Sequence, residues 1–443
     1  MTAHGDREGF RMDATGQALP PVAANPAWVG CRCVVCGREY DTGFAGFTCD
    51  DCGVDGILDA VYTHDGDVAA RVRAGGADTA RGLWRFSSLL PVAPAAIHPA
   101  WAVGGTAPLP APRLARHLGL RSLVVKDDTS LPSASLKDRA AAVAMARAHM
   151  LGLDHLACAS TGNAACSLAV LASRGGFRST IFVPAAAPQG KLAQLLLHGA
   201  HVIRVDGTYD QAFELSLVEI ENNHWYSRNC GHNPLLVEGK KTSALELAWD
   251  LTRGFTTNED LPDVVLVPVG DGCIVSSTAK AFGELRALGL TDRVPRVIGV
   301  QAAGASPLAA AWARCGGGQA TMSGPAIRDA ITPVIPDTIA DSISVGVPRN
   351  RVKAWRYVAA TGGAFIAAPD EAIVHTICDL AALAGVFAEP SGAAGMAGAL
   401  AARERGLIGD GDRVAVLVTG HGLKDPGAAL GACAMPEPVP PLA

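Results

Sequence analysis

The sequence has few charged residues, few aromatic residues and no long uninterrupted hydrophobic run. Only 18% of its residues are charged, 5% are aromatic, and the formal net charge is -5. Without an excess of positive charge, the composition argues against binding to nucleic acid or to an anionic membrane. No apolar run is long enough to cross a bilayer, and the charged first residues lack the apolar core of a secretory signal. We therefore expect a cytoplasmic protein with no membrane partner and no nucleic-acid partner.

The chain is rich instead in small and apolar residues, with 49% hydrophobic residues and 50 glycines. Its 443 residues are too many for one hydrophobic core, so length alone predicts two or three domains. Of the 12 cysteines, five lie between Cys31 and Cys52, and the other seven are scattered singly through apolar segments. This distribution is not a disulfide framework, because disulfides are rare in large cytosolic chains.

The clustered cysteines have the spacing of a zinc ribbon. Cys33 and Cys36 form one C-x2-C pair, and Cys49 and Cys52 form a second pair after a gap of twelve residues. Four thiolates at this spacing bind a structural zinc tetrahedrally, which leaves no open position for catalysis. Cys31 is a fifth thiol that could replace one of these ligands. Buried free cysteines are the alternative interpretation.

Short apolar runs alternate with helical stretches from Leu123 onward, for example in "SLVVK", "HLACAS", "STIFVP", "DVVLVPV" and "RVAVLVT". This alternation predicts parallel sheets with helices on both faces, and two sets of it predict two doubly wound α/β domains. The predicted order is an N-terminal tail at 1–27, the zinc-ribbon module at 28–63, a loose, proline-dotted connecting arm at 64–100, the first α/β domain at 101–235, the second at 236–430 and a C-terminal tail at 431–443.

The segment "SASLKDRAAA" places Lys137 in the first turn of a predicted helix that continues to Met150. Ser135 has the side chain of an N-cap, and the carboxylate of Asp138 can reach back to the open amides. The ammonium of Lys137 would face the positive end of the helix dipole, which favours the neutral amine. A neutral amine is a nucleophile, whereas a solvated surface lysine is the alternative.

Other candidate site residues follow predicted strands, because ligands bind at the carboxyl ends of strands in open α/β sheets. Ser160, Thr161 and Asn163 lie at a helix start, where hydroxyls and free amides can bind a carboxylate, although an ordinary helix cap is equally consistent. Thr419 supplies a hydroxyl at the end of the last strand run.

A glycine-containing turn follows the strand run "DVVLVPV" and leads into another predicted helix. Such a turn can present backbone amides to a phosphate, although the carboxylate of Asp271 would repel a phosphate unless it turns away. Together, the lysine, the asparagine loop, this turn and the strand-end hydroxyl are the four contacts that pyridoxal phosphate would need. The turn consists of Gly270, Asp271, Gly272, Cys273 and Ile274.

With these motifs in this order, the sequence resembles the threonine synthase family, pyridoxal-phosphate enzymes of fold type II. The resemblance runs from Cys31 to Pro426 and is carried by "PSASLKDRA", "STGNAA", "LLVEGKKTSALEL", "VPVGDGCI", "FAEPSGAAGMAGAL" and "VTGHGLKD". It implies elimination of phosphate from O-phosphohomoserine followed by addition of water to give threonine. We expect a small amino-acid substrate and a homodimer.

The resemblance also implies a role for each candidate residue. Lys137 would bind the cofactor covalently and move protons on one face of the substrate. The other roles would be Asn163 at the cofactor's phenolic oxygen, residues 270–274 at its phosphate, Thr419 at its pyridine nitrogen, Ser160 and Thr161 at the substrate carboxylate, and Lys241 at the substrate phosphate, with Arg139 as a further candidate.

The sequence departs from the family pattern at two places. Leu136 stands where the family usually has phenylalanine, and Asp271, Cys273 and Ile274 replace a turn rich in glycine and asparagine. The second departure leaves other substrates open, as in enzymes similar to cysteate synthase or to serine and threonine ammonia-lyases. A zinc-ribbon interaction protein with non-catalytic α/β domains is the alternative from another class.

Overall fold

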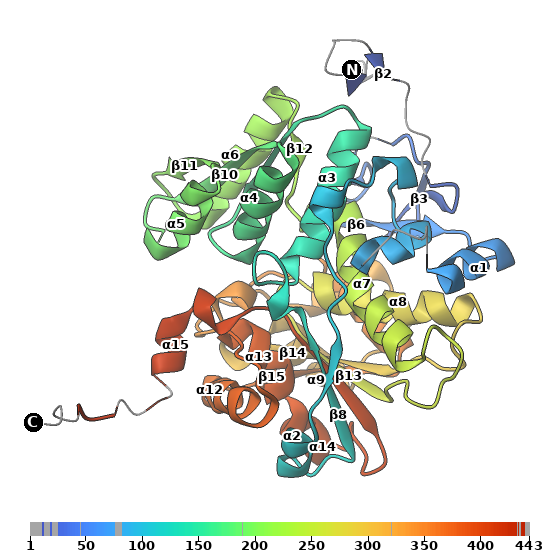
Figure 1. The fold of residues 1–443 in the computed structure, drawn as a ribbon, viewed down its shortest axis with the longest axis vertical. Coiled ribbons are helices and arrows are strands. Elements are labelled where there is room, and N and C mark those ends of the chain that lie inside the picture. The colour runs from blue at the N-terminus through green and yellow to red at the C-terminus, as the bar shows by residue number, and fades with distance from the viewer. Residues whose placement is uncertain are drawn as a thin grey trace, which may run out of the picture.

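The computed structural model describes residues 11–12, 18–19, 25–44, 46–75, 82–187, 189–319, 321–431, 433 and 436–438. Figure 1 shows a smaller α/β lobe (green), a larger α/β lobe (mainly orange and red) and an antiparallel module formed by the N-terminal part of the chain (blue). Ahead of that module, β1 (Arg11–Met12) pairs with β2 (Ala18–Leu19). The rest of the two predicted tails lies largely outside the described residues. Within those residues, no helix is both long enough and apolar enough to span a membrane.

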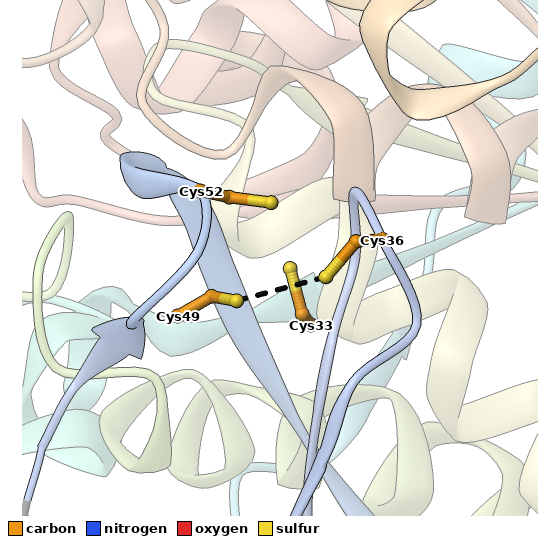
Figure 2. A group of neighbouring side chains, drawn as sticks. All are labelled: Cys33, Cys36, Cys49 and Cys52. Carbon is orange, nitrogen blue, oxygen red and sulfur yellow. Dashed lines mark hydrogen bonds between the residues drawn. The ribbon is translucent and has the colours of Figure 1, made fainter.

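The antiparallel module brings the two predicted cysteine pairs together. Its strand order is β4-β3-β6-β5. Each pair consists of a cysteine at the end of a short strand and another in the following turn, so the four sulfurs point toward one another (Figure 2). The strands are β3 (Trp28–Cys33), β4 (Glu39–Tyr40), β5 (Thr48–Cys49) and β6 (Gly53–Tyr62).

The smaller lobe is a parallel sheet of order β11-β10-β9-β12. Alternate residues of β9 face opposite sides, so Leu156 and Cys158 pack with α3 and α4, while Ala157 and Ala159 pack with α6. Helices therefore cover both faces, as predicted. The elements are α3 (Lys137–Met150), β9 (His155–Ala159), α4 (Asn163–Gly175), β10 (Arg178–Pro184), α5 (Gln189–Leu197), β11 (His201–Val205), α6 (Tyr209–Asn222) and β12 (Tyr226–Ser227).

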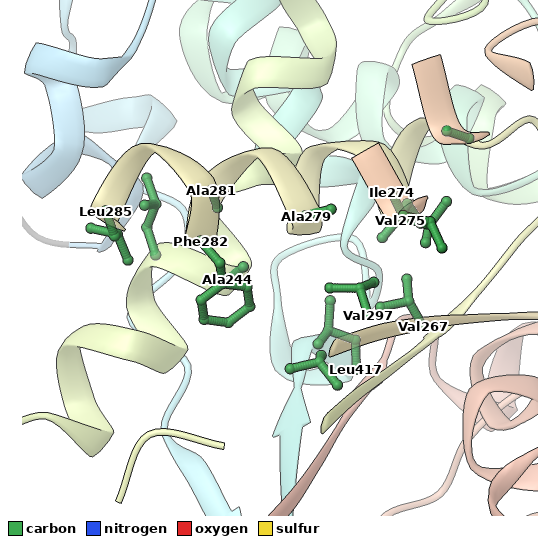
Figure 3. Packing of buried hydrophobic residues seen from close by; sticks show 14 of the residues in the cluster. Ala244, Val267, Ile274, Val275, Ala279, Ala281, Phe282, Leu285, Val297 and Leu417 are labelled. Atoms are coloured by element: carbon green, nitrogen blue, oxygen red, sulfur yellow. The ribbon is translucent and has the colours of Figure 1, made fainter. Parts of the chain in front are cut away.

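The larger lobe is a sheet of order β15-β14-β13-β16-β8-β7, parallel except for β7. On one face, Phe282 and Leu285 of α8 pack in one cluster with Val267, Val297 and Leu417 of three neighbouring strands (Figure 3). Helices α9 and α11 join this face, and α2, α12, α13 and α14 cover the other. The strands are β7 (Pro108–Pro110), β8 (Ser122–Asp127), β13 (Val264–Pro268), β14 (Arg296–Ala302), β15 (Ala364–Ala368) and β16 (Arg413–Val418).

The helices of the larger lobe and of the connection to it complete the fold. Helix α7 packs against both α3 and α8, so it joins the two lobes and the cysteine module. A side chain at Gly239 of α7 would bring its Cβ to 2.2 Å from the backbone oxygen of Arg139 in α3. The helices are α2 (Pro112–His117), α7 (Leu235–Leu251), α8 (Cys273–Ala287), α9 (Pro307–Arg314), α10 (Gly324–Ala330), α11 (Arg351–Ala360), α12 (Asp370–Asp379), α13 (Pro390–Ala397), α14 (Ala399–Glu404) and α15 (Pro426–Leu430).

Two organisational predictions need correction. Strand β8 precedes the lysine helix in the chain and was predicted in the first domain, at 101–235, but it pairs with β16 in the larger sheet. The predicted arm at 64–100 is not loose: it contains α1 (Gly66–Ala74) and a 3-10 segment, Gly82–Leu89, with Phe86 and Leu89 fully buried. Most of its buried apolar side chains precede the first proline, Pro91, and they pack into the core.

Candidate active site

The start of α3 is fixed by hydrogen bonds within its own leading segment and by one from the end of β16 in the larger lobe. The helix begins at Lys137, one residue later than a Ser135 cap would allow, although the Ser135 hydroxyl oxygen still accepts the Lys137 amide at 3.3 Å. The Asp138 carboxylate reaches back, as predicted, and accepts the Ser133 amide at 2.6 Å. The Leu136 amide donates to the backbone oxygen of Thr419 at 2.9 Å, which joins the end of β16 to the lysine segment.

A cavity of about 610 Å³ lies between the two lobes and receives most of the predicted site residues. Both lobes contribute to its walls: the loop before α4 comes from the smaller one and the turn before α8 from the larger one. The structure therefore brings together residues that are far apart in the sequence. The predicted residues that line the cavity are Lys137, Ser160, Thr161, Asn163, Gly270, Asp271, Gly272, Cys273 and Ile274.

Lys137 is only partly exposed to this cavity. Burial lowers the pKa of its amine to about 8, and the nearby positive charge of Lys240 adds to the shift. A substantial fraction of Lys137 is therefore neutral near pH 8, which is the state that a nucleophile or a proton acceptor needs. The sequence predicted this neutral state from the helix dipole, whereas the larger causes are burial and a neighbouring lysine.

The asparagine loop contacts a carboxylate that the sequence analysis did not single out. The Asn163 side-chain amide donates to Glu389 Oε1 at 2.6 Å and to the Ser342 hydroxyl at 3.3 Å. Burial raises the pKa of Glu389 above its ordinary value. Glu389 precedes α13 in the motif "FAEPSG", so its place in the motif was visible in the sequence but its contact with Asn163 was not.

The turn before α8 has the geometry of an anion site. Gly272 has a left-handed backbone with φ 88°, and no side chain caps the first amides of the helix. A Cβ at Gly272 would lie 2.9 Å from the Ala354 Cβ. The Asp271 carboxylate accepts the Arg349 amide at 3.2 Å, so a backbone partner holds the carboxylate that was expected to repel a phosphate.

Thr419 is buried at the end of β16, and it is not among the described residues that line the cavity. Its backbone oxygen accepts the Leu136 amide, which brings the strand end next to the lysine segment. A role for its hydroxyl at a pyridine nitrogen stays a prediction.

The structure places Lys241 and Arg139 away from the cavity, so their predicted contacts with substrate are wrong. Lys241 is fully buried, with Nζ 2.5 Å from Glu238 and 2.8 Å from Glu284. Arg139 is equally buried and pairs with Asp128 at 2.8 Å and Glu246 at 2.7 Å. Both cations are already neutralised by fixed carboxylates, which leaves no capacity for a substrate anion.

Lys240 faces the cavity in place of Lys241. Consecutive residues on an α-helix point about 100° apart, so two adjacent lysines necessarily reach different surroundings. Burial by itself lowers the pKa of Lys240, but the sulfurs of Cys230 and Cys273 together outweigh burial, and the net shift is upward. Lys240 is therefore a stable positive charge beside Lys137. The sequence "EGKKT" contained both lysines but did not show which would face the site.

The four predicted cysteine ligands form a compact donor set that could hold a metal ion. The sulfurs of Cys33, Cys36, Cys49 and Cys52 all lie within 4.8 Å of one another (Figure 2). The Val35 amide donates to Cys33 Sγ at 3.3 Å, and the Tyr40 hydroxyl donates to Cys49 Sγ at 3.2 Å. Cys31, the fifth candidate, is buried and outside this group.

A cavity between two doubly wound lobes, with a lysine at one helix start and an open helix N-terminus opposite, defines the class of protein. Residues 101–420 match the family described as "Pyridoxal-phosphate dependent enzyme", and the chain belongs to this family. Its relatives place it more narrowly among the threonine synthases. It is 35% identical to the threonine synthase of Methanocaldococcus jannaschii, over 91% of this chain and 95% of the relative. It is 34% identical to the threonine synthase of Methanosarcina acetivorans, over 92% of this chain and 95% of the relative.

Solved structures confirm the predicted fold type II architecture of the two lobes. Threonine deaminase isoform 2 from Solanum lycopersicum is similar with a TM-score of 0.60 and 18% identity, covering 94% of this chain and 98% of that chain. Diaminopropionate ammonia lyase from Escherichia coli has a TM-score of 0.60 and 17% identity, with coverage of 83% and 91%. At these identities the likeness concerns the fold alone.

Proposed function

We propose that this protein is a threonine synthase that converts O-phosphohomoserine and water to threonine and phosphate. The observation that carries the proposal is one cavity in which a lysine with a lowered pKa, Lys137, lies beside a permanent cation, Lys240. The first can move protons, and the second can bind a dianionic leaving group. The full-length similarity to threonine synthases supports the same reaction.

The residues that line the cavity fit pyridoxal phosphate. Lys137 would bind the aldehyde, the Asn163 amide would face the phenolic oxygen, and the open amides at the start of α8 would bind the phosphate. Thr419 would approach the pyridine nitrogen. When bound, pyridoxal phosphate withdraws electrons from the amino-acid carbon to which it is joined.

Lys137 is positioned to carry the protons of the reaction. Its pKa of about 8 allows the amine to take up a proton and return it near neutral pH, with little cost in either direction. Ser160 and Thr161, with the start of α4, would bind the substrate carboxylate and so present one face of the substrate to Lys137. The Ser160 hydroxyl already accepts the Gly162 amide at 3.1 Å, which holds this loop in shape.

Lys240 is the residue that we assign to the substrate phosphate, in place of Lys241. It lines the same cavity as Arg228, a residue that is 1% exposed and whose Nε has no hydrogen-bond partner among the described residues. A buried donor without a partner costs free energy, which a bound anion would recover. Two cations together would also stabilise the charge that grows as the carbon–oxygen bond breaks.

The cysteine module would hold one structural zinc through Cys33, Cys36, Cys49 and Cys52. Tetrahedral zinc with Zn–S bonds of about 2.3 Å places its sulfurs about 3.8 Å apart, which is compatible with the observed group. The metal would fix β6, whose Asp59 and Tyr62 contact the lysines of α7 and α8. A homodimer, measurable by light scattering, and a cytoplasmic location complete the proposal. None of the 12 cysteines forms a disulfide in the structure.

The substrate assay separates this function from its alternatives. The purified protein, supplied with pyridoxal phosphate, is incubated in turn with O-phosphohomoserine, O-phosphoserine and threonine, and phosphate, threonine and keto acid are measured. We expect equal amounts of phosphate and threonine from O-phosphohomoserine. Phosphate release from O-phosphoserine alone would indicate an enzyme similar to cysteate synthase, and keto acid from threonine would indicate an ammonia-lyase. No cofactor band and no product would favour a non-catalytic interaction protein.

A further inference from the structure

The cavity contains a thiol that the proposed reaction does not use. Cys230 follows β12, lines the cavity and is partly exposed to it. Arg228 Nη1 lies 3.3 Å from its sulfur, and Lys240 is its second cationic neighbour. A cysteine that is accessible and surrounded by cations has the environment of a reactive thiolate.

The charges around Cys230 distinguish it from other cysteines of the same cavity. Burial by itself raises the pKa of Cys230, but Lys240, Arg228 and Lys137 outweigh burial and lower it below the ordinary value. Cys158 also lines the cavity, yet burial raises its pKa to about 12. Cys158 therefore remains a protonated thiol, and it provides a matched comparison within one cavity.

A second thiol approaches Cys230 from the larger lobe. Cys273 is the first residue of α8, and its sulfur lies 4.0 Å from the backbone oxygen of Cys230. The Asn350 side-chain amide donates to the Cys273 sulfur at 3.0 Å. Burial raises the pKa of Cys273 to about 11, so the two thiols are unequal. Cys230 is therefore suited to attack an oxidant first, and Cys273 is suited to attack the oxidised sulfur of Cys230 in a second step.

We propose that Cys230 and Cys273 form a redox pair, in which a peroxide oxidises Cys230 and the two residues then close a disulfide across the cavity. The Cys230 thiolate attacks one peroxide oxygen, the O–O bond breaks and hydroxide leaves, giving a sulfenic acid. The Cys273 sulfur then attacks the Cys230 sulfur, the S–O bond breaks, and water leaves with the Cys273 proton. Two thiols are oxidised by two electrons, and one peroxide is reduced to two waters.

The disulfide would inactivate the enzyme reversibly. It would tie the loop after β12 to Cys273 of the anion-binding turn, the first residue of α8, and it would remove the thiolate that faces Lys240. A thiol reductant would restore both groups by thiol–disulfide exchange. The pair does not depend on the identity of the substrate, so it stands independently of the threonine synthase proposal.

Peptide mapping of the full-length holoenzyme tests the proposal. The protein is treated with hydrogen peroxide in slight excess, remaining thiols are alkylated, and the digest is analysed by mass spectrometry. We expect a cross-linked peptide pair joining Cys230 to Cys273, more than 5-fold enriched over untreated protein and lost after dithiothreitol. Cys158→Ser should form the same cross-link to the same extent, and Cys230→Ser should form none. Thermal unfolding confirms that each variant is folded.

Three results would overturn the proposal. The first is that Cys230 and Cys273 both remain alkylatable under conditions that oxidise the clustered cysteines of the N-terminal module. The second is that Cys230 is oxidised to sulfinic acid without a cross-link, which would show that Cys273 does not attack the oxidised sulfur. The third is that the Cys158→Ser variant loses the cross-link, which would show that Cys158, and not Cys230, is the attacking thiol. Because the wild-type map alone can give the first two, the test does not depend on the folding of any variant.

Discussion

The two sides of α7 contain buried lysines that differ in what surrounds them. On the side of the cysteine module, Lys241 joins Lys280 and Lys353 in a network with Asp59, Glu238 and Glu284, so three cations meet three carboxylates. On the cavity side, Lys240 faces a thiol, a second lysine and an arginine, and no carboxylate of the described residues forms an ion pair with it. Balanced charge fixes structure, whereas unbalanced positive charge is available to a ligand.

Among substitutions in the cavity, Lys137→Ala should cause the largest loss of activity. Without this amine, the cofactor cannot be bound covalently and no group moves the substrate protons, so kcat should fall by about 10⁴-fold or more. Borohydride reduction of the wild-type holoenzyme followed by peptide mapping should mark Lys137, and the variant should carry no mark. Marking of another lysine in the wild type would contradict the assignment.

The difference between the two sides of α7 is tested by making the same substitution at the adjacent positions 240 and 241. Lys240→Met removes the cation that we assign to the substrate phosphate, so kcat/KM for O-phosphohomoserine should fall by about 10²-fold, the loss expected for one charge-stabilising donor. The absorbance of the bound cofactor should persist, because Lys137 is intact. A change of less than about threefold would remove Lys240 from the substrate site.

Lys241→Met should produce the opposite result. The substitution leaves Glu238 and Glu284 short of a buried partner, so the free energy of unfolding should drop by about 3 to 5 kcal/mol. Urea unfolding measures this loss, and kcat/KM per folded molecule should stay near the wild-type value. A stable variant with impaired turnover would instead return Lys241 to the substrate site.

The metal site sharpens the comparison on the structural side of α7. Cys49→Ser should abolish zinc binding, because it removes one of four ligands, whereas Cys31→Ser, a change on the same module, should retain the metal. Metal content is measured by atomic emission after gel filtration. The Cys49→Ser protein should also unfold at a lower temperature, because β6 carries Asp59 and Tyr62 into the charge network. Equal zinc content in both variants would reject the site.

The smallest expected effect is a shift in the pH dependence of Lys137. Its lowered pKa means that the amine is charged below about pH 8 and neutral above it, so acetylation of the cofactor-free protein at Lys137 should rise through a midpoint near 8. Lys240→Met should raise that midpoint, because Lys240 repels the charged form. Competitive labelling read by mass spectrometry measures both values. An unchanged midpoint would show that burial alone sets the pKa of Lys137.

The sequence predicted the elements of the lobes better than their pairing. The apolar run "SLVVK" is a strand, as predicted, but its partner β16 lies near the other end of the described chain, and periodicity carries no information about such a partner. Strand β15, "AFIAA", was missed because small residues give it little β propensity. The cavity was predictable in part, because parallel strands of the larger sheet end at one edge, which brings together the lysine segment after β8 and the glycine turn after β13. The asparagine loop follows β9 of the smaller sheet, so its approach depends on how the two lobes pack.

The side-chain assignments within the site show a sharper limit. Which of two adjacent lysines faces the cavity depends on the rotation of α7 relative to its neighbours, which is set by its packing against α3 and α8. Glu389 and Cys230 were also missed, because their importance comes from contacts with residues that are distant in the sequence. Residue type and spacing therefore located the site but did not distinguish the groups that line it from those behind it.

Strand β16 has a consequence for how the protein is made. It lies between β13 and β8 at the centre of the larger sheet, yet it is the last described strand to leave the ribosome. At about 5 to 20 residues per second, roughly a quarter of a minute to a minute separates the synthesis of Lys137 from that of Thr419. During that interval β8 has an unpaired edge, and the lysine segment has no strand end to join. The lysine segment can therefore reach the arrangement seen in the folded protein only after β16 and Thr419 have been translated.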